Sequence, residues 1–293
     1  MKTIFLTGGT GFIGKNLIEF LQNKYKILSP SHKELDLLDT KAVDGFFKKN
    51  KVDVVVHTAN IGGLRNSGLS NDSIKNNLTI FFNVVRNKEK FKKMIHLGSG
   101  AEYDRSKDII EAKETDFGLT IPNDDYGFYK YICSKYIENV DNIYCLRIFG
   151  IFGKYEDFNV RFISNLICKY IYKIPLTMIQ DCNFDYIYID DFVKIIEYFI
   201  EKNPKEKFFN IGSEGKVRLY SLAKTINKLD DYSLPIEIKR EGLNREYTSN
   251  NDRLKKEIKD LKLTPIEIAI TKLYEYYLSN KLIIDPNLLT KNE

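Results

Sequence analysis

The feature that most constrains the fold of this chain is a glycine loop near its N-terminal end. An apolar run over residues 2–7 leads directly into Gly8, Gly11 and Gly14, and an amphipathic segment follows at once. A strand, a tight turn and a helix in this order form a dinucleotide-binding unit, because the glycines let the turn close and let a pyrophosphate reach the N-terminus of the helix. The chain is therefore expected to bind a dinucleotide.

Strand and helix patterns alternate through the first half of the chain, which predicts a parallel sheet. The predicted strands there cover 2–7, 25–29, 52–56, 93–97 and 143–147, and the predicted helices cover 12–23, 40–50, 70–89 and 126–139. Beyond residue 150 we predict helices at 158–172, 190–202, 219–229 and 265–279 and strands at 184–189 and 207–211. The expected fold class is α/β. A doubly wound Rossmann sheet with helices on both faces spans 1–150 and is extended by segments from 184–212, and a smaller, mainly substrate-binding α/β region spans 151–293.

Bulk properties narrow the class of protein further. The net charge of +5 comes mostly from scattered lysines, so we expect no nucleic-acid partner, although a mildly basic surface suits an anionic substrate. No apolar run reaches the roughly 18 to 20 residues that cross a bilayer, and the N-terminus is itself the first strand, so we expect a cytoplasmic protein without a membrane partner. The four cysteines lack C-x-x-C spacing, and we expect neither a metal site nor a disulfide.

Three polar residues form a pattern that carries chemistry. Tyr126 and Lys130 are four residues apart on a predicted helix, which places both side chains on one face. A neighbouring ammonium favours the tyrosinate form, so the pair can exchange a proton with a substrate. Ser99, which follows the predicted strand at 93–97, can donate a hydrogen bond to a carbonyl oxygen that also meets Tyr126. A glycine loop, this serine and the Tyr-x-x-x-Lys pair in one chain are a stronger signal than the pair alone.

With these motifs the chain resembles the extended short-chain dehydrogenase/reductase family (the NAD-dependent epimerase/dehydratases), in its nucleotide-sugar branch. The segments that also carry the resemblance are Val56–Ala59, Asn77, Leu146–Gly153, Asp185–Asp191 and Phe209–Gly212. The stretches at 34–39 and 61–63, and those around Phe149 and Phe184, are most similar to reductases of 4-keto-6-deoxy sugar nucleotides of the GDP-fucose synthase and CDP-abequose synthase type.

The resemblance implies a role for each matching residue. Tyr126 would protonate the alkoxide that develops at sugar C4, Lys130 would assist it and bind the nicotinamide ribose, and Ser99 would orient the keto oxygen. The implied cofactor contacts are Gly8, Thr10, Gly11, Phe12, Ile13, Gly14, Ser31, His32, Lys33, Asp36, Leu37, Ala59, Ile61, Asn77, Leu97 and Phe149. The implied substrate contacts are Gly100, Ala101, Phe184 and three arginines, Arg161, Arg218 and Arg245, with Arg147 as a further candidate for the diphosphate. Each arginine can instead be an ordinary surface residue.

Two departures from the family pattern predict what the enzyme does not do. Sugar dehydratases of the family carry an Asp-Glu pair just after the Ser/Thr, where this chain has Gly100 and Ala101. GDP-fucose synthase has a cysteine two residues after the serine and a later histidine that epimerise C3 and C5, and this chain has Ala101 and Arg161 there. We therefore expect a reductase that lacks both the dehydratase and the epimerase residues.

The turn after the second predicted strand bears on the choice of cofactor. NAD enzymes place an acid at the end of this strand to bind the ribose 2′-hydroxyl, but here no acid occurs before Glu34. Ser31, His32 and Lys33 can instead receive a 2′-phosphate. We therefore favour NADPH over NAD.

The sequence as a whole predicts an NADPH-dependent reductase of an NDP-4-keto hexose or heptose, made for a surface polysaccharide. A 4-epimerase of the UDP-galactose type, which uses the same Ser-Tyr-Lys set with tightly bound NAD, is the alternative, and the missing acid after the second strand counts against it. A non-catalytic dinucleotide sensor is a third reading, but such proteins typically lose the tyrosine or the lysine. The family also implies a homodimer through the helices at 70–89 and 126–139.

Overall fold

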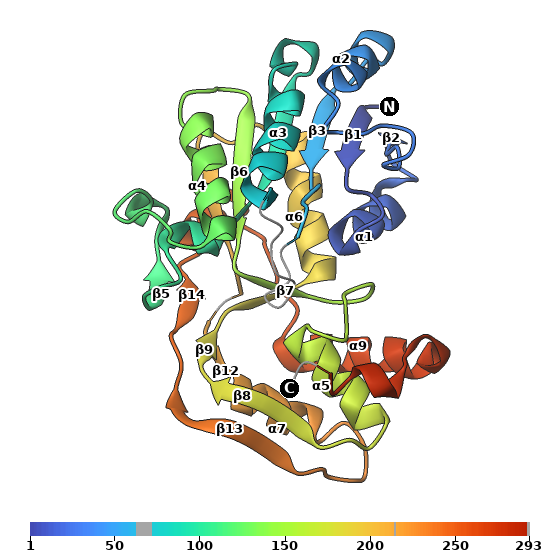
Figure 1. Cartoon of the computed structure of the whole chain (residues 1–293), viewed down its shortest axis with the longest axis vertical. Coiled ribbons are helices and arrows are strands. Elements are labelled where there is room, and N and C mark those ends of the chain that lie inside the picture. The colour runs from blue at the N-terminus through green and yellow to red at the C-terminus, as the bar shows by residue number, and fades with distance from the viewer. Residues whose placement is uncertain (63–71, 214, 292–293) are drawn as a thin grey trace.

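A six-stranded parallel sheet forms the centre of the computed structural model, which describes residues 1–62, 72–213 and 215–291 (Figure 1). Its strand order is β11-β6-β4-β3-β1-β2. The strands are β1 (Thr3–Thr7), β2 (Lys26–Leu28), β3 (Val54–His57), β4 (Lys93–Ser99), β6 (Ile143–Ile148) and β11 (Phe208–Ile211). Every neighbouring pair is parallel, so the carboxyl ends of the strands meet at one edge of the sheet.

Helices cover both faces of this sheet. Successive residues of each strand point to opposite faces, and apolar side chains occur on both, so each face is buried under helices. Ile4 and Leu6 of β1 belong to one apolar core with helices α1 (Phe12–Leu21) and α6 (Ile189–Glu201). Phe5, between them, belongs to a second core on the other face. The helices over that face are α2 (Thr40–Lys49), α3 (Ser73–Val85) and α4 (Asp125–Ile137). The predicted doubly wound sheet is confirmed.

A smaller region below the sheet in Figure 1 is built from short strands and further helices. Its helices are α5 (Phe162–Ile171), α7 (Leu219–Ile226) and α9 (Ile266–Ser279), whereas α8 (Asp252–Glu257) contacts β11 of the central sheet. Two of its sheets have two strands each: β7 (Gly150–Phe152) pairs with β10 (Tyr186–Tyr188), and β8 (Leu176–Asp181) pairs with β13 (Ile236–Leu243). A four-stranded sheet has the order β12 (Val217–Arg218), β9 (Asn183–Phe184), β14 (Tyr247–Ser249) and β5 (Ile109–Ala112). Short 3₁₀ turns lie at Lys88–Lys90, Gly100–Tyr103, Glu114–Asp116, Lys281–Ile283 and Pro286–Leu288.

Several predicted elements differ from those observed. The expected strand at 184–189 is interrupted at Asp185, so that β9 and β10 join different sheets. The buried Asp185 carboxylate accepts hydrogen bonds from the backbone N–H groups of Ser213 (2.6 Å) and Ser249 (3.3 Å), which ties three crossing segments together. The helix expected at 158–172 begins only at Phe162. Of the helix expected at 70–89, residues 70 and 71 lie outside the described residues, and the helix that the structure shows, α3, ends at Val85 and not at residue 89.

Membrane-spanning helices, clusters of metal-ligating side chains and disulfides are all absent from the described part of the chain. Within residues 1–62, 72–213 and 215–291, no helix is both long and apolar enough to cross a membrane. The same ranges contain no group of three or more His, Cys, Asp or Glu side chains that could hold a metal ion. All four cysteines are buried free thiols.

Candidate active site

The glycine loop between β1 and α1 has the shape that a pyrophosphate needs. Gly8 has a φ of +72°, and a Cβ there would lie 2.8 Å from the backbone nitrogen of Ala59. A Cβ on Gly14 would overlap the carbonyl oxygen of Gly8, so the helix can approach the loop this closely only without a side chain. The bare backbone at the N-terminus of α1 fits a dinucleotide phosphate.

The other predicted cofactor contacts surround the carboxyl ends of β2 and β3. Asn77 of α3 accepts from the backbone N–H of Ile61 and donates to its carbonyl oxygen, both at 2.8 Å, so it fixes the segment after β3. Thr10, His32 and Lys33 are exposed, and Asp36 and Leu37 are half-buried in the turn after β2. Ala59 contacts the glycine loop, as described above. Gly63, part of the matching stretch at 61–63, lies outside the described residues.

The three predicted catalytic residues line a single cavity of about 520 Å³. Ser99 lies at the end of β4, and its hydroxyl oxygen accepts from the backbone N–H of Ala101 at 3.1 Å. Lys130 is buried and donates from Nζ to the carbonyl oxygen of Leu97 at 2.5 Å. Its Nζ lies 5.9 Å from the centroid of the Tyr126 ring. The structure therefore brings the serine, the tyrosine and the lysine together, as predicted.

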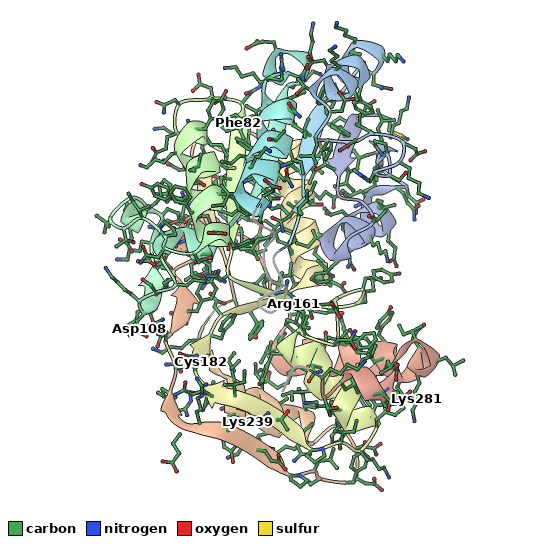
Figure 2. The ribbon with its side chains drawn as sticks, viewed as in Figure 1. Phe82, Asp108, Arg161, Cys182, Lys239 and Lys281 are labelled. Carbon is green, nitrogen blue, oxygen red and sulfur yellow. The ribbon has the colours of Figure 1, made fainter. Side chains whose placement is uncertain are left out.

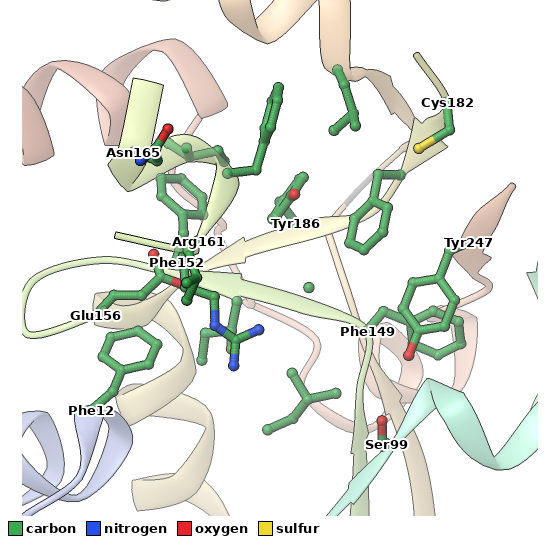
Figure 3. Close-up of a pocket in the computed structure, with 18 of the residues that line it drawn as sticks. Phe12, Ser99, Phe149, Phe152, Glu156, Arg161, Asn165, Cys182, Tyr186 and Tyr247 are labelled. Atoms are coloured by element: carbon green, nitrogen blue, oxygen red, sulfur yellow. The ribbon is translucent and has the colours of Figure 1, made fainter. Parts of the chain in front are cut away.

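The cavity has aromatic side chains on both sides, and the labelled charged side chains lie on the side away from Ser99 (Figure 3). Phe149 and Tyr247 stand beside Ser99, with their ring centroids 4.9 Å apart, and Phe184 lies 5.1 Å from Tyr247. Phe12, Glu156 and Arg161 lie opposite. The predicted cofactor contacts that line this cavity are Phe12, Ile13, Leu97 and Phe149, and the predicted substrate contacts that line it are Arg161 and Phe184.

The charges in the cavity wall are mostly positive. The basic side chains that line the cavity are Arg105, Lys130, Arg161, Lys169 and Lys239. Glu156 supplies the single carboxyl group among the described lining residues. Burial raises the pKa of Glu156 to about 8, although a hydrogen bond from Ser164 at 2.7 Å and the charge of Arg161 oppose the shift. Glu156 is therefore largely uncharged at neutral pH, and the cavity suits an anion.

The four candidate arginines have different environments. Arg161 directs its guanidinium into the cavity, near the middle of the molecule (Figures 2 and 3). Arg147 is fully buried, and its Nε donates to the Glu102 carboxylate at 2.6 Å. The Glu102 charge raises the pKa of Arg147 even though burial opposes this. Arg147 is thus a structural residue, and its candidacy for the diphosphate is wrong.

Arg218 and Arg245 also lie away from the cavity. Arg218 donates to the Asp181 carboxylate and does not line the cavity wall. Arg245 is exposed and does not line it either. The structure therefore brings only one of the three predicted substrate arginines into the cavity.

Arg105 is a cavity residue that the sequence did not single out. It pairs with Asp124, and its Cζ lies 5.5 Å from the centroid of the Tyr126 ring. The preceding residue, Asp104, has a φ of +72°, a conformation that aspartate tolerates better than most residues, and the chain reverses there. The sequence signal that could have indicated Arg105 as a cavity residue is its position, next to Asp104 and shortly after Ser99.

Packing after Ser99 leaves no room for an acid. A Cβ on Gly100 would lie 2.7 Å from the Tyr247 hydroxyl and 2.8 Å from two carbons of the Phe149 ring. Ala101 is completely buried. The two positions that the family resemblance aligns with a dehydratase acid and base are thus closed by aromatic rings and by the core.

Comparison with known proteins agrees with this geometry. The model of the NAD dependent epimerase/dehydratase family matches residues 4–212. A GDP-L-colitose synthase from Yersinia pseudotuberculosis is 24% identical over 305 residues, spanning 95% of this chain and 98% of the relative. A GDP-L-fucose synthase from Azorhizobium caulinodans is 28% identical over 188 residues, 59% of each chain.

Solved structures of similar fold include two that contain NADP. A GDP-L-fucose synthetase from Naegleria fowleri bound to NADP superposes with a TM-score of 0.84 at 20% identity, covering 96% of this chain and 94% of the other. A GDP-mannoheptose C4 reductase from Campylobacter jejuni with NADP bound gives a TM-score of 0.77 at 21% identity, covering 94% and 98%. The glycine loop, the Ser-Tyr-Lys cavity and the family match lead to one assignment. The chain belongs to the NAD dependent epimerase/dehydratase family, as an extended short-chain dehydrogenase/reductase enzyme that uses a nicotinamide dinucleotide.

Proposed function

We propose that this enzyme is an NADPH-dependent reductase that converts the C4 ketone of a nucleotide-diphosphate sugar into an alcohol. The sugar is a 6-deoxyhexose or a heptose. The names of the relatives, a GDP-colitose synthase and GDP-fucose synthases, favour GDP as the nucleotide. The positive cavity wall supports a diphosphate substrate, with Arg161 the best-placed side chain to bind its phosphate oxygens.

The observation that carries this proposal is the small set of groups that can move a proton in the cavity. Gly100 and Ala101 offer none, and the position of the epimerase histidine is Arg161, whose guanidinium donates hydrogen bonds and accepts none. Glu156, the remaining carboxyl of the described lining, is buried against Ser164. Tyr186, Tyr247 and Cys182 also line the cavity, but Tyr126 lies beside Lys130 on the same helix, and we therefore take it as the proton donor. One donor suffices to reduce a ketone, whereas elimination or epimerisation at a neighbouring carbon needs a further acid or base.

The residues of the cavity have separate tasks in this reaction. The reduced nicotinamide, when bound, supplies the hydride. Ser99 directs its hydroxyl to the substrate's keto oxygen, since none of the described residues accepts that hydrogen. Tyr126 donates its phenolic proton to the same oxygen as negative charge develops there. Lys130 stabilises the resulting tyrosinate, and its position is fixed by its hydrogen bond to the carbonyl of Leu97.

Loss of NADPH absorbance with a panel of keto sugars tests the proposal. Each NDP-4-keto-6-deoxy sugar is generated by its own dehydratase, and NADH is run as the comparison cofactor. We expect the GDP-sugar to be reduced by the wild type, with kcat lower by about 10²–10⁴-fold in Tyr126→Phe, since proton transfer contributes about that much. Interconversion of UDP-sugars without added cofactor, and no oxidation of NADPH, would replace the reductase with a 4-epimerase.

A homodimer through α3 and α4 also belongs to the proposal. Phe82 of α3 and Phe128 of α4 are 37% and 36% exposed, which is high for phenylalanine and supports a buried role in an assembly. Light scattering should give twice the mass of the 34.2 kDa chain. Phe82→Asp should shift the mass towards that of the single chain.

A further inference from the structure

In the turn that follows β2, the carboxylate of Glu34 accepts hydrogen bonds from Ser31. A cofactor 2′-phosphate bound at this turn would use the same donors of Ser31. Ser31 donates from its backbone nitrogen (2.7 Å) and from its hydroxyl (2.8 Å) to a single oxygen, Oε2 of Glu34. These two hydrogen bonds hold the pKa of Glu34 below its ordinary value, so the group is charged at neutral pH. Ser31 is therefore already occupied by an anion that belongs to the chain itself.

This turn borders the dinucleotide site. Ser29, two residues earlier, donates to the carbonyl of Leu6 at 3.0 Å, and a Cβ on Gly9 of the glycine loop would overlap its hydroxyl. The ribose of a dinucleotide on such a loop extends towards the end of the second strand, where an acid selects a 2′-hydroxyl and cationic or hydroxyl side chains select a 2′-phosphate. β2 ends at Leu28, which places Ser31 and Glu34 in this selecting position.

The charges of the turn do not by themselves decide between the two cofactors. Lys33 is cationic, but Glu34 and Asp36 are both carboxylates, and Asp36 lies 3.6 Å from Nδ1 of the exposed His32. A 2′-phosphate that approached Ser31 would meet the Glu34 carboxylate at hydrogen-bond distance. Like charges this close repel, so one anion has to leave.

We propose that Glu34 is an internal competitor for the 2′-phosphate site, and that it sets the preference of this enzyme between NADPH and NADH. With NADH, Glu34 stays on Ser31, and its second oxygen faces solvent and can accept from the ribose 2′-hydroxyl. With NADPH, the phosphate takes both Ser31 donors and Glu34 turns away. The chain thus binds NADPH more weakly than its Ser31, His32 and Lys33 side chains would allow. The inference rests on the cofactor assignment of the proposed function but not on its sugar chemistry.

Glu34→Gln tests the competition, because glutamine keeps an acceptor for Ser31 and removes the charge. Dissociation constants of NADPH and NADH are measured by titration calorimetry on the intact protein without any sugar substrate. Adenosine 2′,5′-bisphosphate and adenosine 5′-monophosphate isolate the 2′-phosphate in the same way. We expect NADPH and the bisphosphate to bind about tenfold more tightly to the variant, the effect expected for one recovered charge-assisted hydrogen bond. NADH and the monophosphate should bind equally well or more weakly.

Two further variants decide whether the effect acts through Ser31. In Ser31→Ala combined with Glu34→Gln the gain for NADPH should fall below threefold, because the phosphate has lost a recovered donor. Asp44→Asn removes a carboxylate that pairs with Arg86 and Asn87, the two residues that follow α3, and it should leave the ratio of the two constants unchanged.

Three outcomes would overturn the proposal. They are an unchanged NADPH constant in Glu34→Gln, a full gain that persists in the double variant, and a shift in Asp44→Asn as large as that in Glu34→Gln. All of these constants are obtained without turnover. If the reductase assay fails with every keto sugar, the binding constants still test the role of Glu34. If the binding constants contradict the role of Glu34, the Tyr126→Phe assay still tests the reductase proposal.

Discussion

At the scale of single residues, packing around Ser99 decides which chemistry the cavity can hold. The rings of Phe149 and Tyr247 occupy the space that a side chain at Gly100 would need. Rings in a packed wall cannot give way as the end of a flexible side chain can. A dehydratase acid cannot be introduced at this position without rebuilding the wall.

Gly100→Ala should therefore destabilise the protein by about 1–3 kcal/mol, the usual cost of overpacking. The added methyl group would displace the rings of Phe149 and Tyr247, which line the cavity, so the substitution should also lower kcat/KM. Urea unfolding and the NADPH assay measure the two effects.

Gly45→Ala is the matched control for this substitution. Gly45 lies inside α2, and nothing approaches within 4 Å of a Cβ built there, so alanine should stabilise the chain by roughly 0.5–1 kcal/mol through helix propensity. If Gly100→Ala and Gly45→Ala stabilised the protein equally, the rings of Phe149 and Tyr247 would be able to move aside for a methyl group, contrary to this prediction.

At the scale of elements, the start of α4 connects helix stability to the catalytic residues. Asp124 is the N-cap of this helix and accepts from the backbone N–H of Gly127 at 3.0 Å. The same carboxylate holds Arg105, which faces the Tyr126 ring. The Asp124 side chain thus fixes both the first turn of the helix and a cation beside Tyr126, the proposed proton donor.

Three variants separate these two tasks. Asp124→Ala should lose about 0.5–2 kcal/mol of stability, as for other N-caps, together with activity. Asp124→Ser keeps a capping oxygen but not the partner of Arg105, so it should retain most of the stability and still lose activity. Asp39→Ala removes the N-cap of α2, which accepts from the backbone N–H of Lys41 at 2.8 Å, and should cost stability with little change in kcat. Full activity in Asp124→Ser would show that Arg105 needs no anchor.

The long elements of this chain, and the cavity that Ser99, Tyr126 and Lys130 share, were predictable from local pattern. Val54, Val55 and Val56 form an unbroken buried run in β3, and the helices that pack on the sheet carry one apolar face. Ser99, Tyr126 and Lys130 met in one cavity because a strand end and a helix start adjoin in this fold.

The short strands and the charged partners were not predictable in this way. β13 contains the sequence Ile-Glu-Ile-Lys-Arg-Glu-Gly-Leu, mostly exposed, and is a strand because β8 pairs with it from about sixty residues away. Arg147 and Arg105 look alike in the sequence. Their roles differ because Glu102 meets one in the core, while Asp124 holds the other at the cavity. Such pairings depend on tertiary contacts that leave no local signature.

At the scale of the whole molecule, buried groups of opposite type make stability depend on pH in opposite directions. Burial lowers the pKa of His57 to about 3 and that of His96 well below its ordinary value, and the Lys130 charge adds to both shifts. The two rings stack with their centroids 5.5 Å apart. Neither nitrogen of His96 has a hydrogen-bond partner among the described residues. Both histidines remain neutral in the folded state.

His96→Leu should therefore stabilise the protein increasingly as the solution becomes more acidic. Below about pH 6.5 the unfolded wild type binds a proton at His96 that the folded state does not, so the wild type loses stability by up to about 1.4 kcal/mol per pH unit. The leucine variant lacks this loss. Urea denaturation at pH 8, 6.5 and 5 measures the difference in free energy of unfolding, which should grow towards pH 5. A difference that stays constant would mean that His96 takes up a proton in the folded state.

Glu156 should act in the opposite direction. Its folded pKa of about 8 lies above the ordinary value of 4.5, so between these limits the folded state keeps a proton that the unfolded state releases. The wild type therefore loses stability as the pH rises from 4.5 to 8, again by up to about 1.4 kcal/mol per unit. Glu156→Gln removes this pH dependence, and its side chain can still accept a hydrogen bond from Ser164. The free energy of unfolding of the variant, relative to that of the wild type, should therefore increase from pH 5 to pH 8. Both proteins contain the same histidines, so the histidine contribution cancels in the difference between them, and the interval from pH 6.5 to 8 reports on the carboxyl. If the two proteins ran parallel there, Glu156 would be ionised in the folded state, and the cavity would contain a carboxylate opposite the diphosphate that Arg161 is proposed to bind.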